Sequence, residues 1–230
     1  MTSRSGRYVF QHVPKTAGTS LWVAFVGLFG RDQVSDPVGS MEFMTEEEAA
    51  ALRPRRVVSG HISQRDVARH FPDYSLLTVV RHPLDREISS YYFHRALSTP
   101  NMANEMTIDE FFFRTTNRDG TRELWNRQVR QLGGQQRDSN LDLRAALKAA
   151  KENLKRCAWL GIHDRLDADL ARLRRLADFA ALPDLPKERV TEVRPACEEV
   201  PEHLRRRILD THPYDLELYH WAREYSADRD

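Results

Sequence analysis

The stretch from Tyr8 to Trp22, YVFQHVPKTAGTSLW, constrains the fold of this chain more than any other segment. It predicts an apolar strand over Tyr8–Val13, a short loop with lysine, glycine and hydroxyl side chains, and a helix over Thr19–Phe29. Such a strand–loop–helix turn directs several backbone N–H groups and the positive end of a helix at one point. Because Lys15 adds a full positive charge, we expect the loop to bind an anion. For this segment by itself, an ordinary βα turn with a solvated lysine is the alternative.

Strands and helices alternate along the rest of the chain. Further strands are predicted over Arg56–Gly60, Tyr74–Val80 and Ala158–Ile162. Helices are predicted between and after them, over Gln64–His70, Leu84–Leu97, Leu141–Leu154, Leu166–Ala180, Glu202–Thr211 and Tyr214–Glu224, with capping boxes at Thr45–Glu48 and Thr107–Glu110 opening two more. This alternation predicts an α/β fold, a P-loop-like three-layer domain whose central, mostly parallel sheet is flanked by helices. No linker or repeat divides the 230 residues, so we expect one domain over residues 1–230.

Polar residues follow each of the first three predicted strands. They are the segment His12–Lys15, the segment Ser59–Ser63 with His61 at its centre, and Arg81-His82. Ligands of parallel sheets bind beyond the carboxyl ends of the strands, where these residues would meet. We therefore expect one site built from three strand ends, with His61 as a candidate general base and His12 supporting the loop from beneath.

The second motif is RHPLDREISSYYF, which begins at Arg81 at the end of a predicted strand. Ser89 follows eight residues later, about two turns into the next helix. An arginine there can fork onto a phosphate while the serine hydroxyl donates a further hydrogen bond. A surface ion-pair cluster formed with Asp85, Arg86 and Glu87 is the alternative for this motif alone.

Composition excludes several other classes of protein. Lysine and arginine number 35 against 34 acidic residues, a net charge of +1 that gives no reason to expect a nucleic-acid partner. The longest apolar run, Leu21–Phe29, falls far short of the roughly 18 residues of a membrane span, and no signal peptide precedes the first strand. Cys157 and Cys197 suggest no disulfide framework, so we expect a reducing cytoplasm. No HExxH motif or paired Cys/His spacing predicts a metal site.

The two motifs together resemble those of sulfotransferases that use 3′-phosphoadenylyl sulfate (PAPS). The order Pro-Lys-Thr-Ala-Gly-Thr-Ser from Pro14 resembles their 5′-phosphosulfate loop, and the motif from Arg81 to Ser89 resembles their 3′-phosphate site. Ser59-Gly60-His61-Ile62-Ser63 is similar to the Gly-His segment that carries the catalytic base in the heparan sulfate 2-O branch. Weaker likenesses are Asn126–Leu132, to the heparan sulfate 6-O branch, and Trp159–Ile162 and Asp215–Tyr219, to the wider family. The chain departs from the family at His82, where an acidic residue is common, and in showing no membrane anchor.

The resemblance implies a role for each candidate residue. Lys15 and His61 would be catalytic, Lys15 stabilising charge on the bridging oxygen and His61 accepting the proton of the acceptor hydroxyl. PAPS, the co-substrate, would be held by the loop and the second motif, a set comprising Lys15, Thr16, Ala17, Gly18, Thr19, Ser20, Arg81 and Ser89. Apart from the resemblance, Arg194 is a further candidate that would close over the nucleotide, and a surface arginine is the alternative. No metal would be needed.

Two other functions stay open at this stage. A P-loop-like nucleotide kinase would need a Walker A lysine directly after the second glycine of GxxxxGK[ST], whereas Lys15 precedes Gly18. A nucleotide-binding module without catalysis would keep the loop and lack the base. The acceptor would bear a hydroxyl, as on a carbohydrate or small metabolite, and no motif in the sequence identifies it.

Overall fold

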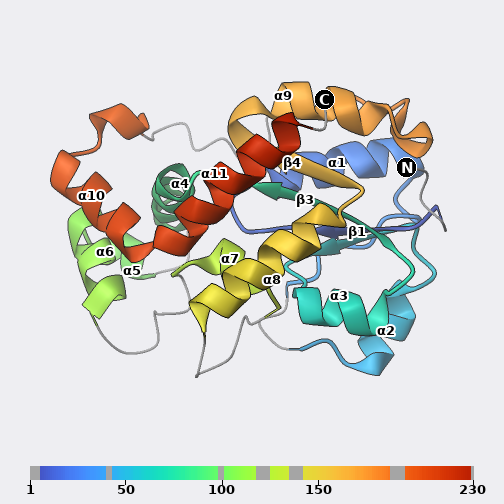
Figure 1. Ribbon diagram of the computed structural model, residues 1–230, viewed down its shortest axis with the longest axis horizontal. Helices are drawn as coiled ribbons and strands as arrows, with labels where there is room; N and C mark the ends of the chain where they lie inside the picture. Colours follow the sequence, from blue (N-terminus) through green and yellow to red (C-terminus); the bar gives the residue numbers. More distant parts are fainter. Residues whose placement is uncertain are drawn as a thin grey trace.

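A computed structural model describes residues 6–39, 43–97, 101–117, 125–134, 142–186 and 195–228, without side chains at 102 and 113–117. Its centre is a parallel sheet of four strands in the order β2-β1-β3-β4 (Figure 1). The strands are β1 (Tyr8–Gln11), β2 (Val57–Gly60), β3 (Ser75–Val80) and β4 (Trp159–Ile162). This arrangement confirms the predicted α/β fold with a parallel central sheet.

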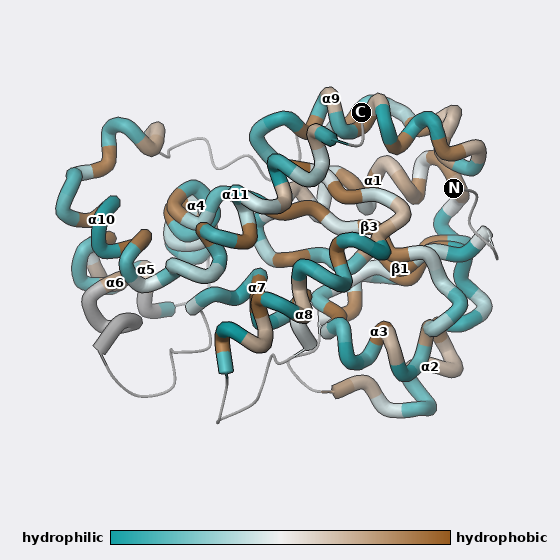
Figure 2. Tube along the Cα trace, in the orientation of Figure 1, coloured by the Kyte–Doolittle hydropathy of each residue, from teal (hydrophilic) through white to brown (hydrophobic). Residues whose placement is uncertain are grey.

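Both faces of the sheet are covered, which explains why its strands are continuous apolar runs. Alternate residues of each strand belong to two separate cores: Val9, for example, belongs to one core while Tyr8 and Phe10 belong to the other. Figure 2 shows hydrophobic residues along the central strands. All four residues of β1, β2 and β4 are buried. A strand with one solvated face would instead alternate between apolar and polar residues.

Helices form the two outer layers (Figure 1). Helices α1 (Gly18–Phe29) and α9 (Leu166–Arg174) cover one face, together with the short 3₁₀ turn Ala177–Phe179. The other face is covered by α2 (Glu46–Leu52), α3 (Gln64–His70), α7 (Arg127–Leu132), α8 (Leu143–Lys155) and α11 (Pro213–Ala227). The sheet with its two helical layers is the three-layer arrangement that the sequence predicts.

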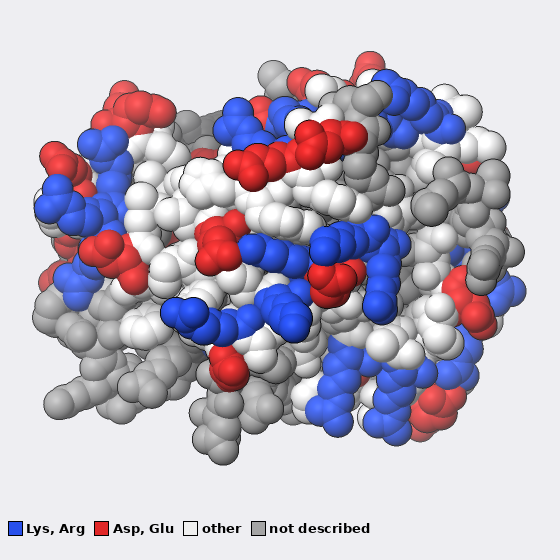
Figure 3. Space-filling model, viewed as in Figure 1, with Lys and Arg blue, Asp and Glu red and all other residues white. Residues whose placement is uncertain are grey.

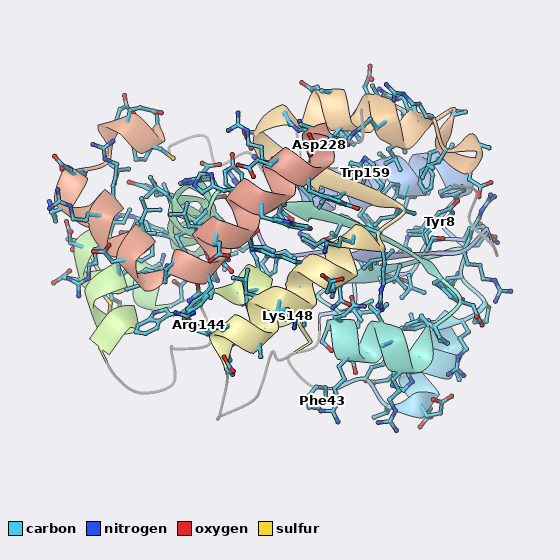
Figure 4. All side chains as sticks on the ribbon, in the orientation of Figure 1. Tyr8, Phe43, Arg144, Lys148, Trp159 and Asp228 are labelled. Carbon is cyan, nitrogen blue, oxygen red and sulfur yellow. The ribbon has the colours of Figure 1, made fainter. Side chains whose placement is uncertain are left out.

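A third apolar core lies beside the sheet, on the left of Figure 1. It joins α4 (Pro83–Arg95), α5 (Met102–Glu105), α6 (Ile108–Asn117) and α10 (Glu202–Thr211). Tyr8 and Trp159, the first residues of β1 and β4, lie toward the opposite side of the view (Figure 4). The carboxyl ends of the strands therefore point toward α4 and this helical cluster.

Local sequence signals account for most element boundaries. The structure forms both predicted capping boxes: Thr45 caps α2 with Glu48, and Thr107 exchanges hydrogen bonds with Glu110 at the start of α6. The long helix predicted over Leu166–Ala180 is instead α9 followed by the 3₁₀ turn at Ala177–Phe179. Helices α5 and α7 were not assigned from periodicity, because segments of four and six residues are too short to show it.

Basic and acidic side chains are mixed on the surface formed by α8 and α11 (Figure 3). Lys151 pairs with Glu217 across the two helices, and Lys155 pairs with Glu152 within α8. Over the described ranges, no helix combines the length and apolar character needed to span a bilayer.

Candidate functional site

Three strand ends bring the predicted site residues to one edge of the sheet. Because β1 lies between β2 and β3, the loop after β1 is flanked by His61 after β2 and by Arg81 after β3. A direct hydrogen bond joins two of these segments, since Arg81 Nη1 donates to the backbone oxygen of Lys15 over 2.7 Å. The loop after β1 and the second motif thus form one unit.

The loop between β1 and α1 has an unusual backbone. Lys15 and Ala17 adopt left-handed conformations, with φ of 69° and 65°, and each such residue costs roughly 1–3 kcal/mol. Ala17 is also the N-cap of α1 and has no side-chain oxygen to accept from the first turn. Between them, Thr16 is fully buried, and its hydroxyl donates to the carbonyl of Val13 over 2.7 Å. Toward a ligand, this segment therefore offers backbone N–H groups in preference to the Thr16 hydroxyl.

His12 supports this loop, as the sequence predicts. A Cβ atom built on Gly18 would lie only 1.9 Å from Nε2 of His12, so the ring packs directly against the start of α1. The ring is stacked on Phe10 at a centroid distance of 5.8 Å and lies 4.9 Å from the ring of His61. This close approach therefore requires glycine at position 18. The start of α1, and the loop before it, pack on the ring of His12.

His61 and His12 are held in their neutral forms. Burial, and secondly the positive charge of Arg127, lower the pKa of His61 to about 4. Burial lowers the pKa of His12 to about 3, with His61 and Lys15 adding to the effect. At neutral pH the His61 imidazole can therefore accept a proton, which a general base must do. The backbone N–H of His61 donates to the backbone carbonyl of Val38 over 2.8 Å, which fixes the main chain at this position.

The cations of the site are oriented by neighbours on α4. The Lys15 ammonium lies 3.9 Å from the ring centre of Phe93, a cation–π contact. Arg81 Nε donates to Asp85 over 2.5 Å. Ser89, one turn before Phe93 on α4, is buried, as is Arg81. Lys15, Arg81 and Ser89 therefore all adjoin the first three turns of this helix.

The ion-pair alternative for the second motif is partly present, but it is buried. Arg86 pairs with Glu87, and Glu87 also lies 3.3 Å from Nε2 of His212. Burial alone would raise the pKa of Glu87, but Arg86 and His212 together lower it to about 2. Burial lowers the pKa of His212, and Glu87 reverses this so that the net direction is upward. These charges tie α4 to the start of α11 and do not form a solvated surface cluster.

Two glutamines missed by the sequence reasoning hold the strand ends together. Gln131 Nε2 donates to the carbonyls of His12 and Ile62 over 3.0 and 3.2 Å. Gln11, at the end of β1, donates to the Ile62 carbonyl over 3.0 Å. Both side chains are fully buried. An amide inside an otherwise apolar strand was the available signal at Gln11, whereas the only signal at Gln131 was the weak family likeness of Asn126–Leu132.

Helix α7 is fixed to α11 by reciprocal capping. Asn126, in a left-handed conformation, accepts through Oδ1 from the N–H groups of Tyr214 and Asp215, each over 3.0 Å. In return the Asp215 carboxylate accepts from the N–H groups of Gln128 and Val129 over 3.2 and 2.8 Å. Burial raises the pKa of Asp215. The segment Asn126–Leu132 is therefore anchored to α11, and its Gln128 contacts the backbone of Arg81 after β3.

Two parts of the prediction are left open by the geometry. Arg194 lies outside the described residues. Across the parts of the chain that the structure describes, no three His, Cys, Asp or Glu side chains gather into a group that could hold a metal ion.

Comparison with known proteins identifies the family. A model of the sulfotransferase family matches residues 1–222, nearly the whole chain, and the protein belongs to that family of enzymes. Among solved structures, a sulfotransferase from Alicyclobacillus acidocaldarius is similar, with 15% sequence identity, a TM-score of 0.44 and 94% of each chain covered. A search of curated proteins found no match.

Proposed function

We propose that this enzyme transfers the sulfuryl group of PAPS to a hydroxyl of a carbohydrate or small metabolite, with adenosine 3′,5′-bisphosphate as the product. The observation that carries the proposal is the 2.7 Å bond between Arg81 and the backbone of Lys15. It joins a loop suited to one phosphate group to an arginine suited to a second. PAPS carries two phosphate positions, and the second separates it from ATP.

Each residue has a distinct role in the proposed reaction. The loop N–H groups from Thr16 to Ser20 bind the 5′-phosphosulfate, aided by the positive end of α1. The acceptor oxygen attacks sulfur while its proton passes to neutral His61, and the bond from sulfur to the bridging oxygen breaks. Lys15 stabilises the negative charge that the leaving 5′-phosphate acquires.

The second phosphate gives a role to Arg81 and Ser89 of the second motif. Arg81, whose guanidinium contacts Asp85 and the Lys15 carbonyl, binds the 3′-phosphate, and the Ser89 hydroxyl adds a hydrogen bond. Arg194 closes over the same nucleotide in this proposal. The Ser59–Ser63 segment and the Asn126–Leu132 segment favour the heparan sulfate 2-O and 6-O branches among the relatives. We place the enzyme in a reducing cytoplasm, in keeping with the absence of a disulfide between Cys157 and Cys197.

Nucleotide-dependent stabilisation tests the donor assignment. Ligand that binds the native state raises stability by RT ln(1 + [L]/Kd), about 2.7 kcal/mol at 100 times Kd. Adenosine 3′,5′-bisphosphate should therefore raise the melting temperature by several degrees, and adenosine 5′-phosphate by much less. A larger shift with ATP and Mg²⁺ than with the bisphosphate would favour a nucleotide kinase and refute the proposal.

Transfer itself needs a second assay. Labelled sulfuryl donor incubated with pools of carbohydrate and small-metabolite acceptors should give a labelled product. If the bisphosphate binds but no acceptor class is labelled, the chain acts as a nucleotide-binding module without catalysis.

A further inference from the structure

Gln128 of α7 holds the backbone of Arg81. Its side-chain oxygen accepts from the N–H of Arg81, and its side-chain nitrogen donates to the carbonyl of Arg81, both over 2.9 Å. Arg81 comes directly after the last residue of β3, whose ladder with β4 ends at Val80. The primary amide thus occupies the place that a peptide group of a neighbouring strand would take.

The Gln128 end of this contact is held in place by burial and by a hydrogen bond to α11. Gln128 is fully buried, and its own N–H donates to the Asp215 carboxylate over 3.2 Å. The carboxylate is itself carried by α11 and also caps Val129. A chain of hydrogen bonds therefore runs from α11 through α7 to the end of β3.

The Arg81 end of the contact is also held in place, at both its main chain and its side chain. Gln128 fixes the main chain of Arg81, while Asp85 and the Lys15 carbonyl fix its guanidinium, over 2.5 and 2.7 Å. A shift of the main chain would move the guanidinium against both of these partners. Displacement of a binding group by about 1 Å can cost orders of magnitude in function.

We propose that Gln128 is a positioning residue that sets Arg81 for recognition of the 3′-phosphate. The inference rests on the proposed function, because it assumes that Arg81 binds that group. Gln128 is uncharged and acts through Arg81, so it should affect only the part of nucleotide affinity that depends on the 3′-phosphate.

Calorimetric titration of Gln128→Met with two nucleotides tests this role. Methionine has a similar length and no hydrogen-bonding amide, so both bonds to Arg81 are lost. Affinity for adenosine 3′,5′-bisphosphate should fall roughly tenfold, and affinity for adenosine 5′-phosphate by less than about twofold. Equal losses for both nucleotides would mean that Gln128 serves stability alone.

Gln131→Met is the matched control. Gln131 lies on the same helix, is also fully buried, and donates to carbonyls beyond β1 and β2 instead of β3. It should leave the ratio of the two affinities within about twofold of the wild-type ratio. A drop in this ratio as large as that of Gln128→Met would overturn the specific role of Gln128.

A double-mutant cycle separates action through Arg81 from any other route. In an Arg81→Ala background, Gln128→Met should change the affinity ratio no further, because the group it positions is gone. An undiminished effect in that background refutes the inference. If Gln128→Met does not fold, Gln128→Asn replaces it, since it keeps the amide but withdraws it by about 1.5 Å, one carbon–carbon bond.

Failure of the proposed function would look different. Wild-type protein that binds both nucleotides equally would show that Arg81 does not recognise the 3′-phosphate. If the wild type binds adenosine 3′,5′-bisphosphate more tightly than adenosine 5′-phosphate, and Gln128→Met and Gln128→Asn keep the same ratio of affinities, the proposed function stays intact and the role of Gln128 is refuted.

Discussion

Replacing Gly18 by alanine should drive a methyl group into the ring of His12. The new Cβ atom would lie 1.9, 2.0 and 2.2 Å from Nε2, Cδ2 and Cε1 of that ring. Carbon atoms prefer separations of about 3.5–4.0 Å, so the ring or the helix start must move by about 1.5 Å. The ring cannot turn away freely because Phe10 and His61 pack against it.

The expected cost follows from the behaviour of overpacked sites. Such insertions destabilise by about 1–3 kcal/mol, and for a chain of this size each kcal/mol lowers the melting temperature by about 2–4 °C. Gly18→Ala should therefore melt about 2–12 °C below the wild type in differential scanning calorimetry, and a urea titration should show a lower denaturation midpoint. Because the first turn of α1 carries the loop, affinity for adenosine 3′,5′-bisphosphate should fall as well.

A control and a rescue make the reasoning refutable. Gly27→Ala, in the same helix, meets only Pro183 Cγ at 3.6 Å, an ordinary contact, and should be neutral or stabilising by up to about 1 kcal/mol. Removing the ring in His12→Ala should relieve Gly18→Ala, with a coupling of about 1–3 kcal/mol in the double mutant. If Gly18→Ala melts like the wild type, or the two losses simply add, the close packing of His12 is not what requires glycine.

The remaining predictions concern catalysis, the donor and pH. Lys15→Ala should lower kcat by about 10²–10³ in the transfer assay while weakening adenosine 3′,5′-bisphosphate much less, because its charge acts in the transition state. His61→Ala should abolish most transfer at unchanged bisphosphate affinity, and wild-type kcat/KM should rise with pH through about 4 and stay level to neutrality, since the base must be neutral. Arg81→Ala should cost about one to two orders of magnitude in bisphosphate affinity and little in adenosine 5′-phosphate affinity, with Ser89→Ala showing the same selectivity more weakly, both by calorimetry. Urea midpoints should fall as pH drops below about 6.5, and they should fall less steeply in His12→Ala. The reason is that the pKa of His12 is lowered in the folded protein. Below the pKa of the unfolded chain, the unfolded chain binds a proton at His12 that the folded protein does not, so the stability present at higher pH is lost.

Each of these predictions has an outcome that contradicts it. Near-normal kcat in Lys15→Ala would remove the lysine from the reacting centre. Loss of folding in His61→Ala would assign the histidine a packing role. Equal losses of affinity for the two nucleotides in Arg81→Ala would show that Arg81 does not bind the 3′-phosphate. A pH dependence of stability identical in His12→Ala and the wild type would show that His12 is not held neutral by the fold.

Local physical signals were enough to predict the sheet and its flanking helices. Apolar β-branched runs such as Tyr74–Val80 can only be buried on both faces, which implies parallel strands covered by helices. Strong caps defined the starts of α2 and α6 at Thr45 and Thr107. The loop at Lys15 and the motif at Arg81 were visible because lysine, arginine and hydroxyl residues directly follow the strands in the chain itself.

Other features depended on contacts between distant segments. The strand order places β1 between β2 and β3, so that His61 and Arg81 flank the same loop, and no local pattern encodes that order. The roles of Gln128 and Gln131 arise because α7 lies across the strand ends, more than 45 residues along the chain from Arg81. The same residues would be ordinary polar positions of a short helix elsewhere.

The sequence alone determined which chemical groups this protein brings to its site: a lysine loop before a helix, a histidine after β2, and an arginine with a helical serine after β3. It could do so because these groups follow their strands within a few residues. Only the tertiary structure decided their state and precision. Burial makes His61 and His12 neutral, His12 leaves no room for a side chain at Gly18, and buried amides fix the strand ends. Burial and long-range hydrogen bonds are properties of packed segments, and these arise only when the chain has folded.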